Sequence, residues 1–499
     1  FIWDFVDQAL WWPADASKYG TDHVFVFGGD FNDYDPSDNS FNSNGIIAAD
    51  RSWHPHAYEV AYQYRSILTS AGAEWGKVNV HNEYFFIDLS RYIMEWDVEV
   101  DGVPVLAGVV PSLDVDPQQA AKVELGFNEA DVMEAAGVRD IASHDVYLNV
   151  RYVLKRADGI LSAGTEVSYD QICLNEAALE PITDDSGLPE YGENGNLHTF
   201  YGEMAFDGSA NVRVAPWKAV FDASTGALVG YELGEKALVE NPLMPCLARA
   251  VIENDLGARQ DRRLDMWRKA EMKVSSFEVF RTDSCYVVSV AFEPVAEAAQ
   301  VKMRYEVYAD GKVVVTESLV DAGKLSEAEM LPRFGVDFAM NGEFSTFEFF
   351  GMGPHENYSD RVSSALMGHY VQRVEDQYHY GYVRPQESGT KTQIKWMRVL
   401  DDNGAGFEIR SDVKFSASAL PFNWKQMDVR MLGNNQAHSL ELKTLVHENQ
   451  RSLGKTWVNV DMAQMGLACV NSWGAWPLEQ YRVKAQPYEF RFVLIPVNN

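Results

Sequence analysis

The sequence predicts a mainly β protein that opens with a piece of a β/α fold and continues as two β-sandwiches. Residues 1–66 contain a short apolar run, a long polar loop and a stretch with helical spacing of apolar residues. Further along, apolar residues alternate with a period of two, interrupted at 178–196 by a stretch rich in Glu, Asp, Gly and Pro. We therefore expect an incomplete β/α unit at 1–66, a sandwich at 67–177, a linker at 178–196 and a large sandwich at 197–499.

Composition excludes several classes of protein. The 499 residues include 42 Lys and Arg against 73 Asp and Glu, which gives a net charge of -31. This field repels phosphate backbones and anionic lipid, so neither nucleic acid nor a membrane surface is expected as a partner. No run reaches the roughly 18–20 apolar residues of a membrane span. The 4 cysteines are widely separated, which predicts free thiols in a reducing compartment and favours a cytoplasmic protein.

The first 66 residues have the order of a single β/α unit. Phe1–Gln8 is nearly continuous in apolar residues and predicts a strand buried on both faces. A loop dense in Gly, Asp and Asn follows at Gly28–Gly45, and Pro55–Ile67 has helical spacing. One such unit cannot bury its own sheet edges. We expect that the rest of its domain lies upstream, and that residues 1 to about 60 are poorly packed or held by another chain.

The next segment predicts an antiparallel sandwich. Tyr92–Val100 alternates cleanly between apolar and polar residues. It leads through Asp101-Gly102, a strong two-residue hairpin signal, into Val103–Val105. Val146–Val153 is another expected strand. Strands at this spacing, without helices between them, are typical of a sandwich of about 100 residues.

The last 300 residues again predict strands. Met303–Tyr308 turns through Asp-Gly into Val313–Val315, and Thr392–Val399 turns through Asp-Asn-Gly into Phe407–Ile409. Tyr488–Ile495 is expected to be the terminal strand. Many strands with little helix indicate one large sandwich.

Two sets of acidic residues near the N-terminus are candidates, one for binding a cation and one for catalysis. The stretch Asp30–Asp38 resembles a loop for a hard cation. It departs from an EF-hand counted from Asp33, because Asp38 replaces Gly at the sixth position and Asn44 replaces Glu at the twelfth. A solvated acidic loop is favoured. Asp4 and Asp7 could act as the carboxylate pair of glycoside hydrolysis. Because they flank apolar strand residues, hydrogen-bonded structural roles are favoured.

Histidine and tryptophan supply the other candidates. His54-Pro55-His56 could suggest a metal, but packing and first-turn roles at a helix start are favoured. The 13 Trp residues are an excess, since aromatic faces stack on the C–H patches of sugars. Most Trp residues belong to cores. Trp473 stands out because it lies in a loop with small and polar neighbours.

Several long motifs in a fixed order give a more specific indication. They are Phe1–Gln8, Gly28–Phe31, Phe41–Gly45, Asp50–Arg51, His54–Pro55, Asn254–Gly257, Gly351–Arg361, Arg384–Gly389, Gln464–Gly466 and Asn471–Trp473. Together they resemble the large β-galactosidases of glycoside hydrolase family 2 over essentially the whole chain. The resemblance implies the C-terminal remnant of a (β/α)8 barrel, an immunoglobulin-like sandwich and a large sandwich of the galactose mutarotase-like supersandwich type.

The resemblance also implies roles for individual residues. Trp3 would form the hydrophobic floor under the sugar. Asn44 and the backbone carbonyl of Phe41 would bind sodium, which contacts the galactose 6-hydroxyl, and the Phe41 ring would gate the pocket. Trp473 would be a stacking platform at the entrance, and the loop after Gly257 resembles a mobile segment. Ligands for Mg²⁺ in the intact enzyme are expected mostly upstream.

The family's two catalytic glutamates match no segment here, so no catalytic residue is assigned. The sequence therefore predicts the C-terminal fragment of a retaining β-galactosidase that acts on lactose-type substrates and is inactive alone. Expected partners are a β-galactoside and the missing N-terminal part of the enzyme, with a homo-oligomer when intact. Two alternatives stay open: a non-catalytic carbohydrate-binding or interaction module, and a small subunit that complements a separate catalytic chain.

Overall fold

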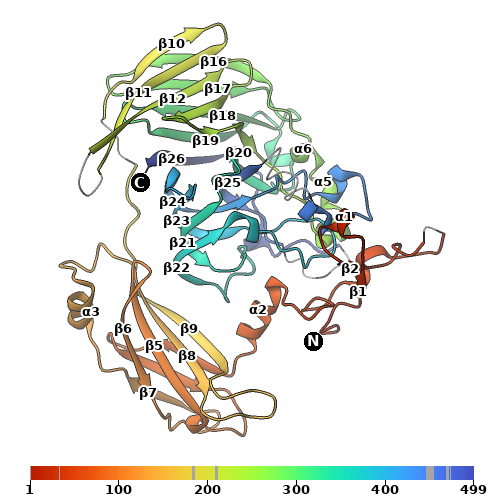
Figure 1. Cartoon of the computed structure of the whole chain (residues 1–499), viewed down its shortest axis with the longest axis vertical. Helices are drawn as coiled ribbons and strands as arrows, with labels where there is room; N and C mark the ends of the chain where they lie inside the picture. Colours follow the sequence, from red (N-terminus) through yellow and green to blue (C-terminus); the bar gives the residue numbers. More distant parts are fainter. Residues whose placement is uncertain are drawn as a thin grey trace.

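The computed structural model describes residues 2–32, 34–182, 186–207, 212–444, 454–467, 471 and 474–498. Their strands form four sheets, and the expected mainly β fold class is confirmed. The smaller sandwich lies below the large sheet in Figure 1, and the N-terminal segment packs beside the large sheet. In this part of the chain the longest helix has nine residues, and no helix is long and apolar enough to cross a lipid bilayer.

The N-terminal segment is mostly irregular. Its elements, in chain order, are β1 (Leu10–Pro13), α1 (Ala16–Tyr19), β2 (His23–Val26), the 3-10 helix η1 (Asn39–Asn42) and α2 (Pro55–Gln63). β1 and β2 form an antiparallel pair. The expected helix is confirmed from its first residue, but it ends four residues before Ile67, which begins the next strand.

The expected strand at the N-terminus is wrong. Residues 2–8 contain one isolated parallel bridge, from Val6 to Ile47, and no extended strand. Trp3 is 82% exposed and Phe5 63% exposed. An apolar run becomes a buried strand only when neighbouring strands cover it, and this chain supplies a single bridge.

The smaller sandwich consists of two sheets around one core. A three-stranded sheet has the order β3 (Ile67–Ala71), β4 (Lys77–Asn82) and β7 (Ala120–Glu124). A four-stranded sheet has the order β6 (Val103–Val110), β5 (Tyr92–Val100), β8 (Val146–Leu154) and β9 (Glu166–Asn175). The hairpin at Asp101-Gly102 is confirmed. Between β7 and β8 lies an unexpected helix, α3 (Glu129–Ala136), which is capped by Asn128.

The large sheet contains 17 strands in antiparallel pairs, and several of these pairs join strands that are far apart in the sequence. Its strands are β10 (Glu190–Asn194), β11 (Leu197–Asp207), β12 (Val212–Asp222), β13 (Ala227–Leu233), β14 (Lys236–Val239), β15 (Asn241–Cys246), β16 (Val274–Arg281), β17 (Tyr286–Phe292), β18 (Ala299–Val307), β19 (Val313–Asp321), β20 (Arg333–Asn341), β21 (Thr346–Gly353), β22 (Leu366–Arg373), β23 (Lys391–Leu400), β24 (Ala405–Leu420), β25 (Lys455–Gln464) and β26 (Tyr488–Asn498). All three expected strand groups are confirmed. β10 lies inside the stretch expected to be a linker, because its residues pair with β11.

Short helices lie in the loops between strands of this sheet. They are α4 (Glu253–Gly257), α5 (Gln260–Arg263), α6 (Asp265–Arg268), α7 (Val429–Leu432) and the 3-10 helices η3 (Leu325–Glu327), η4 (Val374–Asp376) and η5 (Glu479–Tyr481), with η2 (Leu89–Arg91) in the smaller sandwich. α4, α5 and α6 lie near the N-terminal segment (Figure 1). They bring the loops of the large sheet against the residues that come first in the chain.

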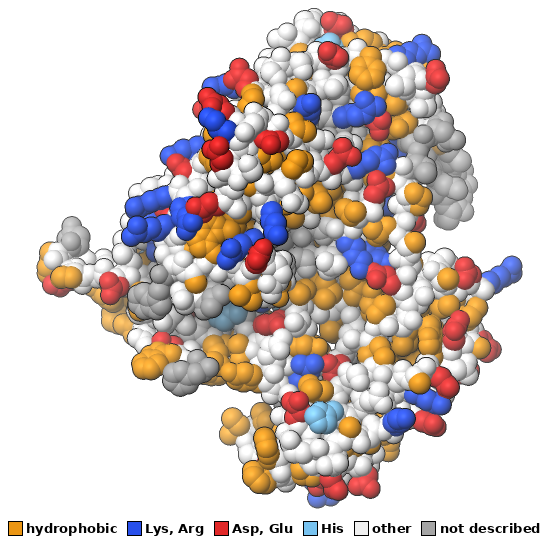
Figure 2. All heavy atoms as spheres, turned by 180° about the vertical axis from the view of Figure 1, so that it is seen from behind, with side chains coloured by type: hydrophobic (Ala, Val, Ile, Leu, Met, Phe, Trp, Pro, Cys, Tyr) orange, Lys and Arg blue, Asp and Glu red, His pale blue; other side chains and the backbone are white. Residues whose placement is uncertain are grey.

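Buried polar contacts join the parts of the molecule. Lys395 on β23 donates to both carboxylate oxygens of Asp145, at 2.6 and 2.8 Å. The N-terminal segment is fixed to the large sheet by Asp30, which lies 2.9 Å from His438 Nε2. On the face in Figure 2, Lys and Arg side chains are interspersed with Asp and Glu, and hydrophobic side chains gather on the lobe that projects at the left. That distribution gives no basic stripe of the kind that binds nucleic acid on this face.

Candidate functional site

A cavity of about 1440 Å³ lies between the N-terminal segment and the large sheet. Trp3, Phe41 and Asn44, all predicted from the sequence, line one side. The opposite side includes Glu253 and Gly257 of α4. The fold therefore brings three of the four predicted sugar-contacting residues to one hollow, together with loops of the large sheet.

The segment that carries Phe41 and Asn44 is fixed by backbone contacts. Gly45 N donates to Asp7 Oδ1 at 2.7 Å, and Gln8 N donates to the Asn42 carbonyl at 2.8 Å. A Cβ on Gly45 would lie 2.2 Å from Asp7 N, so only glycine fits this approach. These contacts hold the turn after η1 beside the residues that follow Trp3.

Asp7 has the structural role that its sequence context favoured. Its second oxygen, Oδ2, lies 2.8 Å from His54 Nε2, and both side chains are buried. His54 Nδ1 in turn lies 3.0 Å from His379 Nε2. Burial lowers the pKa of His379 to about 4, so this ring is neutral at pH 7. Asp4 differs, because it is only half-buried and accepts from Gln8 Nε2 at 2.9 Å.

The two histidines of the His-Pro-His motif support the fold, as expected. His54 is the residue before α2, and Pro55 is the first residue of the helix. His56 Nε2 lies 3.0 Å from the Gly45 carbonyl. Burial lowers the pKa of His56 to about 4, which favours the neutral ring. Both groups of Gly45 are therefore engaged, its N–H by Asp7 and its carbonyl by His56.

A three-residue chain fastens η1 to the large sheet. Arg384 Nη1 donates to Ser40 Oγ at 3.0 Å, and Ser40 Oγ donates to Glu253 Oε1 at 2.8 Å. Arg384 and Glu253 also form an ion pair at 3.0 Å, in which Arg384 is buried and Glu253 is half-exposed to the cavity. Because Ser40 immediately precedes Phe41, this contact sets the position of the Phe41 ring.

A second buried network forms the wall behind these residues. Glu356 accepts from Arg361 at 2.5 Å, Tyr382 at 2.6 Å, and Ser388 Oγ and Gly389 N at 2.7 Å. Burial by itself would raise the pKa of Glu356, but the Arg361 charge and the hydrogen bonds from Tyr382 and Ser388 lower it to about 2. Glu356 is therefore ionised and fully engaged.

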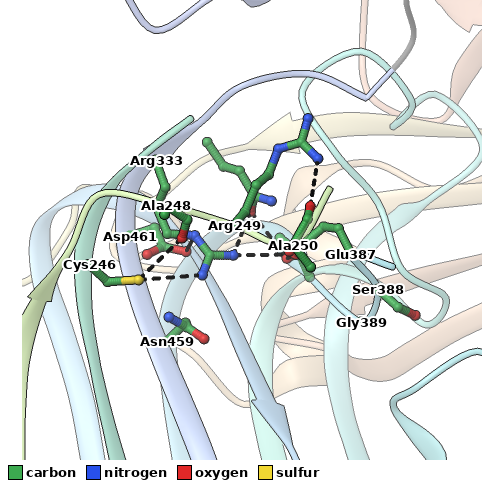
Figure 3. A network of polar contacts seen from close by, with 12 residues as sticks. Cys246, Ala248, Arg249, Ala250, Arg333, Glu387, Ser388, Gly389, Asn459 and Asp461 are labelled. Atoms are coloured by element: carbon green, nitrogen blue, oxygen red, sulfur yellow. Dashed lines mark hydrogen bonds and ion pairs between the residues drawn. The ribbon is translucent and has the colours of Figure 1, made fainter. Parts of the chain in front are cut away.

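The Asn254–Gly257 motif also builds the wall. In the Asn254–Gly257 motif, Asp255 is buried, accepts from Ile252 N at 3.0 Å, and pairs with Arg249 at 3.0 Å. This turns Asn254 and Gly257 toward the cavity. Beneath lies a network around Arg333, which points toward Asp461, Glu387 and the Cys246 sulfur (Figure 3).

In the acidic loop at Asp30–Asp38, Asp30 is mostly buried and bonded to protein groups. Asp30 Oδ2 accepts from Phe27 N at 2.7 Å, and Oδ1 contacts His438 and Gln436. Asp33 lies outside the described residues. Elsewhere in the described part of the chain, no cluster of three or more His, Cys, Asp or Glu side chains could hold a metal ion.

The residues predicted for sodium have suitable donors. Phe41 offers a backbone carbonyl and Asn44 a side-chain amide, which are neutral oxygen ligands of the kind hard cations prefer. Within the same turn, Asn42 Oδ1 and Ser43 Oγ are buried and have no hydrogen-bond partner among the described residues. A small cation would satisfy such oxygens, so the turn fits a sodium ion better than a carboxylate-bound divalent ion.

Trp473, the fourth predicted sugar-contacting residue, lies outside the described residues. Gly474, which follows it in sequence, is described, and a Cβ there would lie 3.6 Å from the Gly257 carbonyl. Gly257 lines the cavity. Glu253 and the Ser40–Arg384 contact were not predicted as site features. Arg384 lies in a recognised motif, but nothing local in the sequence indicates its partners, which are 131 and 344 residues away.

Comparisons with known proteins agree over the whole chain. The model of the β-galactosidase small chain matches residues 213–494, that of β-galactosidase domain 4 matches 78–175, and that of the glycosyl hydrolase family 2 TIM barrel domain matches 1–69. The chain therefore belongs to the β-galactosidase small chain family, and it corresponds to the C-terminal part of family 2 β-galactosidases. The resemblance drawn from the motifs is confirmed.

Curated relatives include three bacterial β-galactosidases. The protein of Halalkalibacterium halodurans is 29% identical over 498 residues, which are 99% of this chain and 45% of the relative. That of Priestia megaterium is 29% identical over 100% of this chain and 44% of the relative. That of Streptococcus thermophilus is 27% identical with the same coverage. The chain thus spans less than half the length of these relatives.

Proposed function

We propose that this chain forms one wall of the substrate site of a retaining β-galactosidase that removes terminal non-reducing β-D-galactosyl residues from lactose-type substrates. The observation that carries the proposal is the meeting of Trp3, Phe41 and Asn44 in one cavity with α4. An exposed aromatic face beside amide and carboxylate groups suits a sugar ring, which has apolar C–H patches and hydroxyls.

Each residue has a distinct part in this proposal. The Trp3 indole lies beneath the sugar. Asn44 and the Phe41 carbonyl hold sodium, which when bound supplies a positive charge for the galactose 6-hydroxyl. The Phe41 ring, positioned through Ser40, gates the cavity, and Trp473 is the platform at the entrance. Mg²⁺ is held mostly by residues of the intact enzyme that this chain does not contain.

The carboxylates of the cavity support a binding role. Hydrolysis that retains the configuration at the anomeric carbon requires two carboxyl groups about 5–5.5 Å apart. One acts as the nucleophile and the other as the general acid. Among the described residues, five carboxylates line the cavity: Asp7 is bound to His54, Glu387 to Arg333, Glu253 to Arg384 and Asp4 to Gln8, and the fifth is Asp38. None of the carboxyl groups whose pKa burial raises is among the lining residues; within the described part of the chain they are Glu99, Asp145, Glu166, Asp255, Glu317, Asp337 and Asp461. We infer that the catalytic pair comes from the part of the enzyme that this chain lacks.

We also infer the cellular compartment and the oligomeric state of the intact enzyme. Cys173, Cys246 and Cys285 are free thiols, which supports a reducing, cytoplasmic environment. A homo-oligomer is expected from the family resemblance.

Activity of the isolated chain provides the test. The purified 499-residue chain is expected to release no nitrophenol from o-nitrophenyl β-D-galactopyranoside above the buffer rate, whereas the protein encoded by the complete gene hydrolyses it. Turnover by the chain alone that disappears in Glu253→Gln would contradict the proposal, because the catalytic carboxylate would then lie within these residues.

A further inference from the structure

A second cavity of about 500 Å³ lies on the other side of the buried wall. It shares no lining residue with the first cavity. Glu356 and His379 separate the two hollows: both line the second, and they contact Tyr382 and His54 of the first. The volume is within the range of small-ligand sites, roughly 300–1,000 Å³.

One side of this cavity is aromatic. Trp53, just before α2, is 49% exposed, and Tyr58 on α2 is 41% exposed. Their ring centroids are 5.1 Å apart, and Tyr58 stacks on the His355 ring at 4.6 Å with an interplanar angle of 11°. The imidazole backs one face of Tyr58 and fixes its plane. An immobilised aromatic surface open to solvent can stack on the C–H face of a pyranose ring at little cost in side-chain entropy.

The floor of the cavity is polar and is supplied by the large sheet. Lys391 at the start of β23 is buried, and its ammonium donates to Gln377 Oε1 at 2.8 Å and to the Gly389 carbonyl at 3.4 Å. Both acceptors are neutral. Burial lowers the pKa of Lys391 to about 8, so the ammonium form predominates at pH 7. The nearby Glu356 carboxylate also acts on this ammonium and raises its pKa, against the larger effect of burial. An ammonium has three N–H donors, and the hydrogen bonds found among the described residues use two of them, so Lys391 can donate to an oxygen-rich ligand as well.

The half-buried amide of Gln372 adds a hydrogen-bond acceptor to this donor. Gln372 Nε2 donates to the Pro354 carbonyl at 3.0 Å. Its Oε1 atom is buried and has no hydrogen-bond partner among the described residues. Sugar hydroxyls both donate and accept, so one pyranose could contact the Gln372 amide and the Lys391 ammonium after a modest side-chain movement.

We propose that this second cavity binds a pyranoside ring as a non-catalytic sugar site, with Trp53 and Tyr58 as its stacking wall and Lys391 and Gln372 as its polar floor. Its lining comes from α2, the residues just before it and loops and strands of the large sheet, and it shares none of these residues with the substrate cavity. The site would hold a second sugar or a distant unit of an oligosaccharide. It does not depend on the proposed hydrolysis.

Ligand-observed and calorimetric titrations with methyl β-D-galactopyranoside and methyl β-D-glucopyranoside test the proposal. Tyr58→Ala is expected to weaken binding of at least one probe by tenfold or more. Tyr64→Ala is the matched control, because Tyr64 is an exposed tyrosine that ends the same helix and lines neither cavity. It is expected to bind like the parent chain. Trp53→Ala is the second variant, and equal thermal unfolding midpoints establish that each variant folds.

The titrations separate this site from the substrate cavity. Trp3→Ala is expected to leave the binding that depends on Tyr58 unchanged. The same variants in the protein encoded by the complete gene establish whether the cavity is open there. Equal affinities of Tyr58→Ala, Trp53→Ala and the parent chain for both probes would overturn the proposal, as would loss of the Tyr58-dependent binding in the complete protein. Either result would leave the hydrolysis assay unaffected.

Discussion

Arg333→Met is expected to destabilise the chain by about 3–5 kcal/mol, because it leaves buried carboxylates without their cation. Arg333 is 1% exposed at the start of β20. Its Nε lies 3.3 Å from Asp461 Oδ2, and its Nη2 lies 3.3 Å from Glu387 Oε1 (Figure 3). Methionine fills most of the space but carries no charge.

Urea unfolding at pH 7 measures the effect. Arg373→Met is the control, since Arg373 pairs with Glu375 and Asp402 at exposed positions, and exposed pairs contribute about 0–1 kcal/mol. Adding Asp461→Asn and Glu387→Gln to Arg333→Met should recover part of the loss, because the uncompensated charges are then absent. A loss below 1 kcal/mol for Arg333→Met would show that the network does not hold ionised carboxylates.

Glu317→Gln is expected to become more stabilising relative to the parent chain as pH rises from 5 to 8, by up to about 1.4 kcal/mol per pH unit. Glu317 on β19 is 0% exposed, and neither carboxylate oxygen has a hydrogen-bond partner among the described residues. Burial raises its pKa well above the usual value, with smaller contributions from the charges of Asp461 and Asp337.

The sign of this dependence follows from proton binding. Above about pH 4.3 the unfolded chain has lost the proton that folded Glu317 retains, so stability falls as pH rises, by about 1.4 kcal/mol per pH unit until the folded pKa is reached. Burial likewise raises the pKa of Asp461 to about 7 and of Asp337 to about 6, against the lowering effect of Arg333, so both add to the same slope. Glutamine removes the contribution of Glu317 alone.

Urea unfolding from pH 5 to pH 8 gives the difference between Glu317→Gln and the parent chain. Glu489→Gln, at an exposed position on the neighbouring strand β26, serves as the control and is expected to change stability by less than 0.5 kcal/mol throughout. Parallel stability curves for Glu317→Gln and the parent chain would contradict a retained proton on Glu317.

The sequence predicts best those strands whose pattern is local. Tyr92–Val100 alternates strictly, and β5 has the same bounds because each inward residue packs in the core of the smaller sandwich. Phe1–Gln8 is equally apolar, but the strand predicted there does not form. A strand buried on both faces depends on neighbouring strands. α3 was missed because its eight residues carry only a short signal, the capping box of Asn128 and Asp131.

The candidate site shows the same contrast between what local sequence predicts and what it does not. Trp3, Phe41 and Asn44 were predicted because motifs near them match a family, and the structure places them in one cavity. The contacts that position them were not predictable. Ser40 meets Glu253 across 213 residues, and no local pattern encodes such a pairing. Motifs therefore identified the side chains, whereas only the fold revealed what holds them.

The direct test of the central claim is the specificity constant of the protein encoded by the complete gene, with Trp3→Ala as the variant. If the cavity around Trp3 holds the sugar, Trp3→Ala should lower kcat/KM for o-nitrophenyl β-D-galactopyranoside by about 100-fold, or ~2.7 kcal/mol. Phe86→Ala, which removes a 95% exposed aromatic ring remote from the cavity, should stay within twofold of the parent. A Trp3→Ala enzyme as active as Phe86→Ala would contradict the account.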